Sequence, residues 1–266
     1  MINTLTANPG TETSIPDLCE RTIQAGLDAI ALHVGDGLML SFDATDARCR
    51  EIRGAVEAAG LRIAALLQTC NVACHFGSRN PAIQHQAVEC TQAALDLAAW
   101  LGTEVLVVEP AVVRSASSGP DNACSYVHAL NGTHAALQRL RFAAERRGVS
   151  IAVTAARNRF LLSPVELRDL IDEQAAPNVG ACLDVAACAA FGRPEDWIHT
   201  LGPRIRCLCL GGQAAPPALD DAAEPSTAFH GVYRALLDVG YAGPLCCPGE
   251  PMSRWLAATS RHTDSS

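Results

Sequence analysis

Two acidic side chains stand where apolar segments end, which is a place where a carboxylate can do chemistry. Asp184 directly follows the apolar residues 181–183, and Glu109 directly follows the apolar residues 105–108. Burying a carboxylate is costly unless it is paired or binds a ligand. We therefore predict that both residues act as catalytic bases or substrate anchors. For Asp184, a helix cap or a buried hydrogen-bond acceptor is the alternative.

Histidine and cysteine side chains provide the partner acid for such a base. His75 lies in the polar loop after the apolar segment 62–67, and Cys209 lies near the end of the apolar segment 205–210. Together with Asp184 and Glu109 they form the predicted catalytic group. Further polar side chains follow the other apolar segments, and we predict that they bind substrate: His33, Gln68, Asn71, Thr154 and Glu250. For His33, a hydrogen-bonded core histidine is the alternative.

Cysteine is frequent, with 12 residues, many of them inside apolar runs. In a cytosolic protein such residues are ordinarily small buried hydrophobes. Strand alternation nevertheless places Cys182 on the same face as Asp184, and Cys207 on the same face as Cys209. Since Zn²⁺ accepts thiolate and carboxylate ligands, a zinc site on Asp184 and Cys209 remains an alternative to our expectation of no metal.

Eight apolar segments typical of strands alternate with helical patterns along the chain. The expected strands are residues 2–6, 29–34, 62–67, 104–109, 150–154, 180–184, 205–210 and 244–247. The clearest expected helices are residues 46–59, 81–101, 128–147, 164–174, 194–201 and 228–239. Glycines at 60, 102, 148 and 240 follow helices where a left-handed cap is favoured, and Ser163 and Asp46 are expected N-caps.

This repeat predicts a parallel α/β fold, a single (β/α)8 TIM barrel over residues 1–266. Loops after strands build the active-site face of such a barrel. Residues 115–122 and 213–225 are therefore candidate active-site loops, and residues from about 257 to 266 form an expected loose tail.

Composition excludes several classes of function. All 20 basic residues are arginine, so a lysine Schiff base and a P-loop lysine are ruled out. The net charge of −8 argues against a nucleic-acid partner. The sequence has no apolar run long enough to span a membrane and no secretion signal at its start, so we expect a cytoplasmic protein.

Several segments resemble one known family. The stretch PAIQHQAVECTQAALDLAAWLGTEVLVVEP (81–110), the region 135–212 and the closing VYRALLDVGYAGPLCC are similar to the sugar phosphate isomerase/epimerase family, the xylose-isomerase-like TIM barrels. The resemblance covers roughly residues 25–250. It implies the barrel fold and a homodimer. It also implies that Asn71 and His75 correspond to an asparagine and a histidine that face the substrate.

The resemblance implies a metal site that this sequence has largely replaced. Family members hold one divalent metal through a glutamate, an aspartate, a histidine and a second glutamate, and the two glutamates shuttle protons. The corresponding residues here are Thr154, Asp184, Cys209 and Pro248, with Glu250 two positions further on. Because Mg²⁺ and Mn²⁺ require several oxygen ligands, we predict that no such cofactor binds.

Three functions are compatible with these residues. The favoured one is metal-independent acid–base proton transfer (isomerisation, epimerisation or elimination) on a small polar keto or hydroxy compound, for example in a specialised biosynthetic pathway. The second is a non-catalytic binding or scaffolding homologue. The third is a metal enzyme with a rebuilt ligand set of cysteine and aspartate.

Overall fold

The computed structural model describes residues 1–7, 14–68, 74–113, 124–211 and 225–247 of the chain. Eight strands pair side by side, all in parallel, and close into a barrel in the order of the sequence. They are β1 (Ile2–Thr6), β2 (Ala29–Val34), β3 (Arg62–Gln68), β4 (Val105–Val108), β5 (Ser150–Thr154), β6 (Val179–Asp184), β7 (Ile205–Cys209) and β8 (Pro244–Cys247). The predicted (β/α)8 barrel is confirmed.

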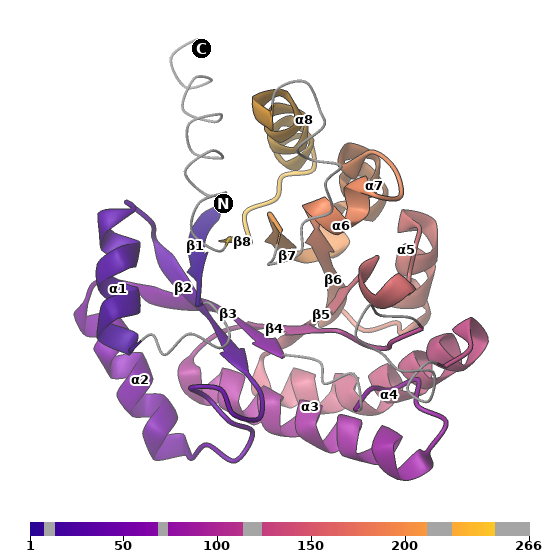
Figure 1. Cartoon of the computed structure of the whole chain (residues 1–266), viewed down its shortest axis with the longest axis horizontal. Helices are drawn as coiled ribbons and strands as arrows, with labels where there is room; N and C mark the ends of the chain where they lie inside the picture. The colour runs from indigo at the N-terminus through magenta and orange to yellow at the C-terminus, as the bar shows by residue number, and fades with distance from the viewer. Residues whose placement is uncertain (8–13, 69–73, 114–123, 212–224, 248–266) are drawn as a thin grey trace.

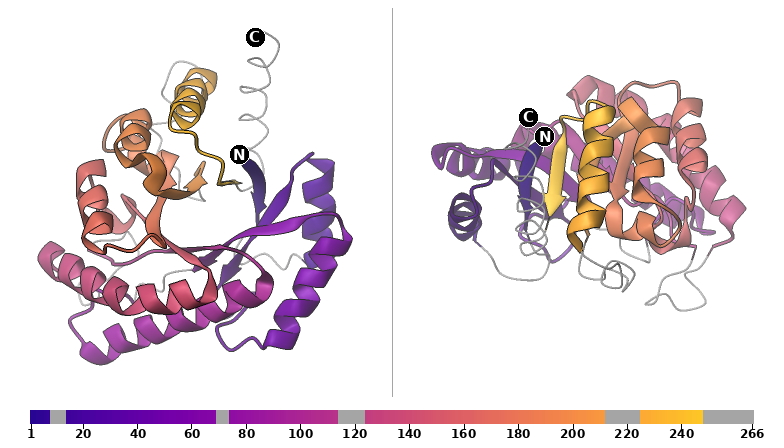
Figure 2. Two further views of the ribbon diagram at one scale, coloured as in Figure 1. Left: turned by 180° about the vertical axis from the view of Figure 1, so that it is seen from behind. Right: turned by 90° about the horizontal axis from the view of Figure 1, so that it is seen from above.

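Helices surround the barrel on the outside (Figure 1), and Figure 2 shows the same ring from behind and from above. The helices are α1 (Ile15–Gln24), α2 (Asp46–Ala58), α3 (Pro81–Leu101), α4 (Tyr126–Arg147), α5 (Pro164–Glu173), α6 (Val185–Ala189), α7 (Pro194–Leu201) and α8 (Pro225–Asp238). Two 3-10 turns, η2 (Arg157–Arg159) and η3 (Gly202–Arg204), complete the described elements. None of the helices in the described part of the chain is long and apolar enough to cross a membrane.

Capping signals in the sequence mark most helix ends correctly. Gly102 and Gly148 cap α3 and α4 in the left-handed conformation, as expected. The Ser163 hydroxyl accepts a hydrogen bond from the Glu166 amide at 3.2 Å. The expectation that Asp46 caps α2 is wrong, because the cap is Thr45, whose hydroxyl accepts from the Arg48 amide at 3.3 Å.

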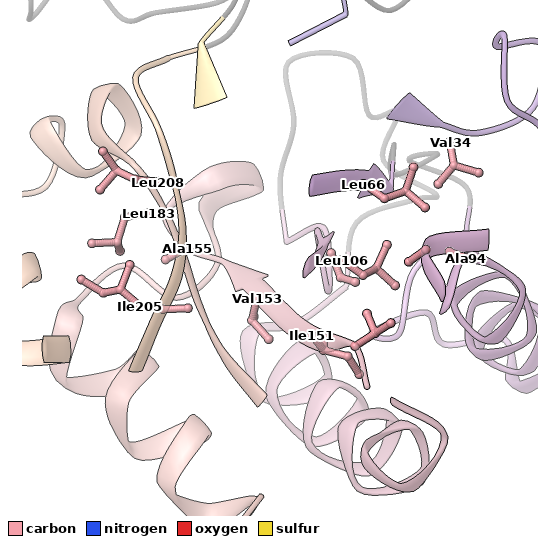
Figure 3. Close-up of a cluster of buried hydrophobic side chains, with 14 of the residues drawn as sticks. Val34, Leu66, Ala94, Leu106, Ile151, Val153, Ala155, Leu183, Ile205 and Leu208 are labelled. Carbon is pink, nitrogen blue, oxygen red and sulfur yellow. The ribbon is translucent and has the colours of Figure 1, made fainter. Parts of the chain in front are cut away.

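The barrel has two concentric apolar layers. The outer layer joins the strands to the helices and contains the large branched side chains, several of which Figure 3 labels on β3 to β7. The buried residues of the inner layer are no larger than valine: Ala31, Ala65, Val105, Val107, Ala152, Cys182, Cys207 and Cys246. The partly buried Leu67 and Cys209 pack against them. Branched residues usually fill this space in such barrels. Here alanines line β2, β3 and β5, while cysteines line three adjacent strands, β6, β7 and β8.

Candidate functional site

The carboxyl ends of β4 to β7 bring together four of the residues singled out in the sequence. Glu109 follows β4, Thr154 ends β5, Asp184 ends β6 and Cys209 ends β7. Asp184 is the register partner of Cys209 on the neighbouring strand. The carboxyl ends of the strands form the face where TIM barrels carry their chemistry.

Asp184 is buried, with 4% of its surface exposed, and it also caps α6. Its Oδ1 atom accepts a hydrogen bond from the Ala187 amide at 3.1 Å. The helix-cap alternative therefore describes a real contact. The cap uses one carboxylate oxygen and fixes the orientation of the side chain, which is how a catalytic carboxylate is pre-organised.

Glu109 is held by a residue that the sequence did not indicate. The Asn158 amide nitrogen donates a hydrogen bond to Glu109 Oε2 at 3.3 Å. Asn158 belongs to η2 and has a φ of +54°. Ala156, Arg159 and Leu161 in the same loop also have positive φ values. A positive φ is energetically costly for residues other than glycine, and residues with this conformation are frequent at functional sites.

Tyr126 at the start of α4 anchors this left-handed loop. Its hydroxyl donates a hydrogen bond to Glu166 Oε2 and accepts one from the Leu161 amide at 3.1 Å. Glu166 Oε2 also accepts from the Leu162 amide at 3.1 Å. Burial, followed by the hydrogen bond to Glu166 and the charge of that residue, raises the pKa of Tyr126 to about 12. The neutral phenol is therefore the form that holds the loop.

Replacing Tyr126 by phenylalanine should lower the free energy of unfolding by about 1–2 kcal/mol, because the Leu161 amide and Glu166 lose a partner. Denaturant melts of this variant, of Glu166→Gln and of the double variant measure the effect as a cycle. We expect the two single effects to be coupled rather than to add. Strictly additive losses would show that the phenol and the carboxylate do not act as a unit.

Four thiols gather on β6, β7 and β8, directly below the carboxyl edge. The sulfurs of Cys182, Cys207 and Cys209 lie within 4.8 Å of one another. Cys182 Sγ is 3.7 Å from Cys209 Sγ, and Cys207 Sγ is 3.7 Å from Cys246 Sγ. Hydrogen bonds with Cys182 first, then with Cys209 and Cys246, and then burial hold the pKa of Cys207 well above its usual value.

Two buried oxygens near this edge lack a hydrogen-bond partner among the described residues, namely Thr154 Oγ1 and Gln68 Oε1. Thr154 as a whole is 6% exposed. Buried polar atoms are almost always hydrogen-bonded. Both oxygens therefore have unused hydrogen-bonding capacity, and substrate binding by Thr154 and Gln68 stays a prediction.

The histidines differ in their surroundings. His75 is buried, with 4% exposed, in the turn before α3, whereas His33 on β2 is partly exposed. The turn of His75 packs closely on α4. A Cβ atom added at Gly132 of that helix would lie 2.2 Å from the carbonyl oxygen of Phe76. The sequence offered no sign that Gly132 positions His75, since only the fold brings the two together.

Several predicted features fall outside the described residues. These are Asn71, Glu250, the loop 115–122, residues 213–224 of the second loop, and the tail from about 257 to 266.

The described residues do not fit a hard divalent metal at the position that the resemblance implies. Thr154, Asp184 and Cys209 supply one carboxylate, one hydroxyl and one thiol. Mg²⁺ and Mn²⁺ favour several oxygen ligands, and a thiol is a soft ligand. The donor set therefore disagrees with an oxygen-coordinated ion.

A closed barrel of eight parallel strands with polar groups at their carboxyl ends defines a TIM-barrel protein. The xylose isomerase-like TIM barrel family matches residues 19–264, so the chain belongs to this family.

Solved structures agree on the fold. A D-psicose 3-epimerase from Clostridium cellulolyticum H10 has a TM-score of 0.75 at 13% identity, covering 99% of each chain. A D-allulose 3-epimerase from Methylomonas sp. has a TM-score of 0.71 at 19% identity, covering 97% of this chain and 89% of that one. The 3-keto-D-glucoside 4-epimerase of E. coli has a TM-score of 0.73 at 14% identity, covering 99% of each chain. No curated protein matches the sequence.

Proposed function

We propose that this protein is an isomerase or epimerase that moves a proton next to a carbonyl group in a small sugar-like compound. The observation that carries the proposal is Asp184, a buried carboxylate fixed by one oxygen at the mouth of the barrel. Glu109, held by Asn158, is the second carboxylate at the same end. Family membership supports the reaction class.

In the proposed reaction, a carboxylate removes a proton from the carbon beside a carbonyl, and a second group returns one to the same or the neighbouring carbon. Asp184 or Glu109 is the base, and His75, His33 or Cys209 is the partner acid. A carboxylate held in a fixed orientation suits this role, because a general base must lie within hydrogen-bond reach of the proton that it removes. The protons balance, since each one removed is returned by the protein or by water.

The proposed reaction uses no metal ion. The support is chemical, because the positions of both family glutamates hold Thr154 and Pro248, neither of which is a strong metal ligand. Without a Lewis acid, the protein's own hydrogen-bond donors must stabilise the enolate that forms. The acid partner of the base, placed beside the carbonyl oxygen, has that task.

The proposed substrate is a ketose or a keto-glycoside. The similar structures are of epimerases whose names give D-psicose, D-allulose and 3-keto-D-glucoside. In this chain the buried oxygens of Thr154 and Gln68 would take substrate hydroxyl groups as partners. A single domain over residues 1–266, acting as a homodimer, completes the proposal.

The test is deuterium exchange in D2O, with the protein at high concentration and D-fructose, D-tagatose and D-allulose as probes. Proton NMR should show loss of the signal at the carbon next to the carbonyl, followed by a new epimer. The rate should not change when a strong chelator is added. Exchange that the chelator abolishes would overturn metal independence, and no exchange or binding with any ketose would overturn the proposed substrate class.

The second candidate is a non-catalytic binding homologue, which the loss of both glutamate positions favours. A binder should retain ligand affinity while showing no deuterium exchange. The same NMR samples separate the two functions, because ligand binding broadens the sugar signals without removing them.

A further inference from the structure

Four thiols lie on the inner face of the barrel. They come from three adjacent strands, β6, β7 and β8, whereas the buried inner residues of β2, β3 and β5 are alanines. Cys182, Cys207 and Cys246 are at most 1% exposed, and Cys209 above them is partly exposed.

The distances agree with those of a metal–thiolate centre. Two thiolates on one tetrahedral Zn²⁺, at about 2.3 Å from the ion, lie about 3.8 Å apart. The Cys182–Cys209 and Cys207–Cys246 sulfur distances are both 3.7 Å. The sulfurs of Cys182, Cys207 and Cys209 lie within 4.8 Å of one another, so three ligands are already close enough to share one ion. Cys246 Sγ is 3.7 Å from Cys207 Sγ but is not within 4.8 Å of all three sulfurs, so this fourth ligand must rotate toward the ion on binding.

We propose that Cys182, Cys207 and Cys209, with Cys246 as the fourth ligand, form a structural site for a thiophilic d10 cation, Zn²⁺ or Cu⁺. Both ions bind thiolate ligands well, whereas Mg²⁺ and Mn²⁺ favour oxygen ligands and are excluded. On binding, each thiol loses its proton to the solvent and forms a sulfur–metal bond, and no electrons are exchanged. This inference goes beyond the proposed function and does not depend on it.

The site would be structural because a sphere of four thiolates leaves no open position for substrate. Structural zinc sites are closed in this way, whereas catalytic sites keep one position for water or substrate. The ion would join β6, β7 and β8 through their inner faces. It would also take Cys209 out of proton transfer, which leaves the acid role to His75 or His33.

The experiment is metal titration of protein prepared under reducing conditions, without chelator during purification and without a metal-affinity tag. We expect about one equivalent of zinc or copper by elemental analysis. After the ion is removed, Co²⁺ added to the full chain should give the thiolate charge-transfer bands of tetrahedral coordination. Thermal unfolding should shift to higher temperature when Zn²⁺ is restored, because the ion binds the folded state.

Cys182→Ala and Cys209→Ala should each weaken binding at least about tenfold. Cys49→Ala is the matched control, since Cys49 is fully buried on α2, outside the cluster. Circular dichroism of the metal-free variants verifies that each is folded. The double variant Cys207→Ala/Cys246→Ala removes the other sulfur pair and should also lose metal binding. Absence of binding in the wild type, or equal binding by cluster and control variants, overturns the site.

Loss of deuterium exchange in metal-free protein that circular dichroism shows to be folded would mean that the ion is catalytic rather than structural, and it would overturn the closed four-thiolate sphere. Normal exchange without metal, together with loss of metal binding in the cluster variants, supports both proposals separately. The deuterium-exchange assay therefore tests the proposed function, and metal binding by the cluster variants tests the thiol site.

Discussion

Replacing Asp184 by asparagine should slow proton exchange into the substrate by a factor of about 10² to 10⁴, the usual effect of removing a general base. The change removes the negative charge and keeps the shape. Asparagine is as good an N-cap as aspartate, so its side-chain oxygen can still accept the hydrogen bond from the Ala187 amide that Asp184 accepts at 3.1 Å. Stability should therefore change by less than about 0.5 kcal/mol.

Asp184→Ala separates the two contributions of this carboxylate. It removes both the charge and the cap of α6, so it should lose the same activity and about 1 kcal/mol of stability in addition. Rates come from the deuterium-exchange assay and stabilities from urea melts. If Asp184→Asn exchanged protons at the rate of the wild type, Asp184 would be a cap alone, and Glu109 would become the candidate base.

Replacing Gly132 by alanine should destabilise the protein by about 3 kcal/mol, at the upper end of overpacking effects. The added Cβ would lie 2.2 Å from the Phe76 carbonyl oxygen and 2.9 Å from its carbon. These are backbone atoms, so the turn carrying His75 must move as a whole. If His75 takes part in the reaction, exchange should fall together with stability.

Gly54→Ala is the matched control, since Gly54 lies inside α2 and a Cβ there meets nothing within 4 Å. That variant should gain about 0.5–1 kcal/mol, because glycine is a poor helix former. Urea melts of both variants measure the difference. A Gly132→Ala protein as stable as the wild type would show that the turn of His75 is not pressed against α4.

The sequence was sufficient for the fold because its strand and helix signals repeat. A short apolar run followed by a helical pattern identifies each unit, and no tertiary contact is needed to recognise it. Two helices were not among the predicted ones. α1 could have been predicted, since its buried residues Ile15, Leu18, Cys19 and Thr22 have helical spacing, but its ten residues give a short pattern. α6 has only five residues, too few for a helical period to show.

The candidate site was harder to predict, because it depends on contacts between distant segments. Asp184, Glu109, Thr154 and Cys209 could be found, since each marks the end of an apolar strand. Asn158 could not, because its role depends on a left-handed backbone that ordinary residues adopt only when the surrounding structure imposes it. The contact between four thiols depends on the register of neighbouring strands, which pairs Cys182 with Cys207 and Cys209 with Cys246.

The layering of the thiols has a consequence for chemical labelling. Of the four clustered thiols, Cys182, Cys207 and Cys246 are buried and only Cys209 is partly exposed. In the metal-free protein, an electrophile shaped like the substrate would therefore reach only Cys209 among these four, and a bound ion would protect it. The fold thus offers covalent inhibitors of the metal-free form a selective point of attachment, set by how deeply each thiol is buried.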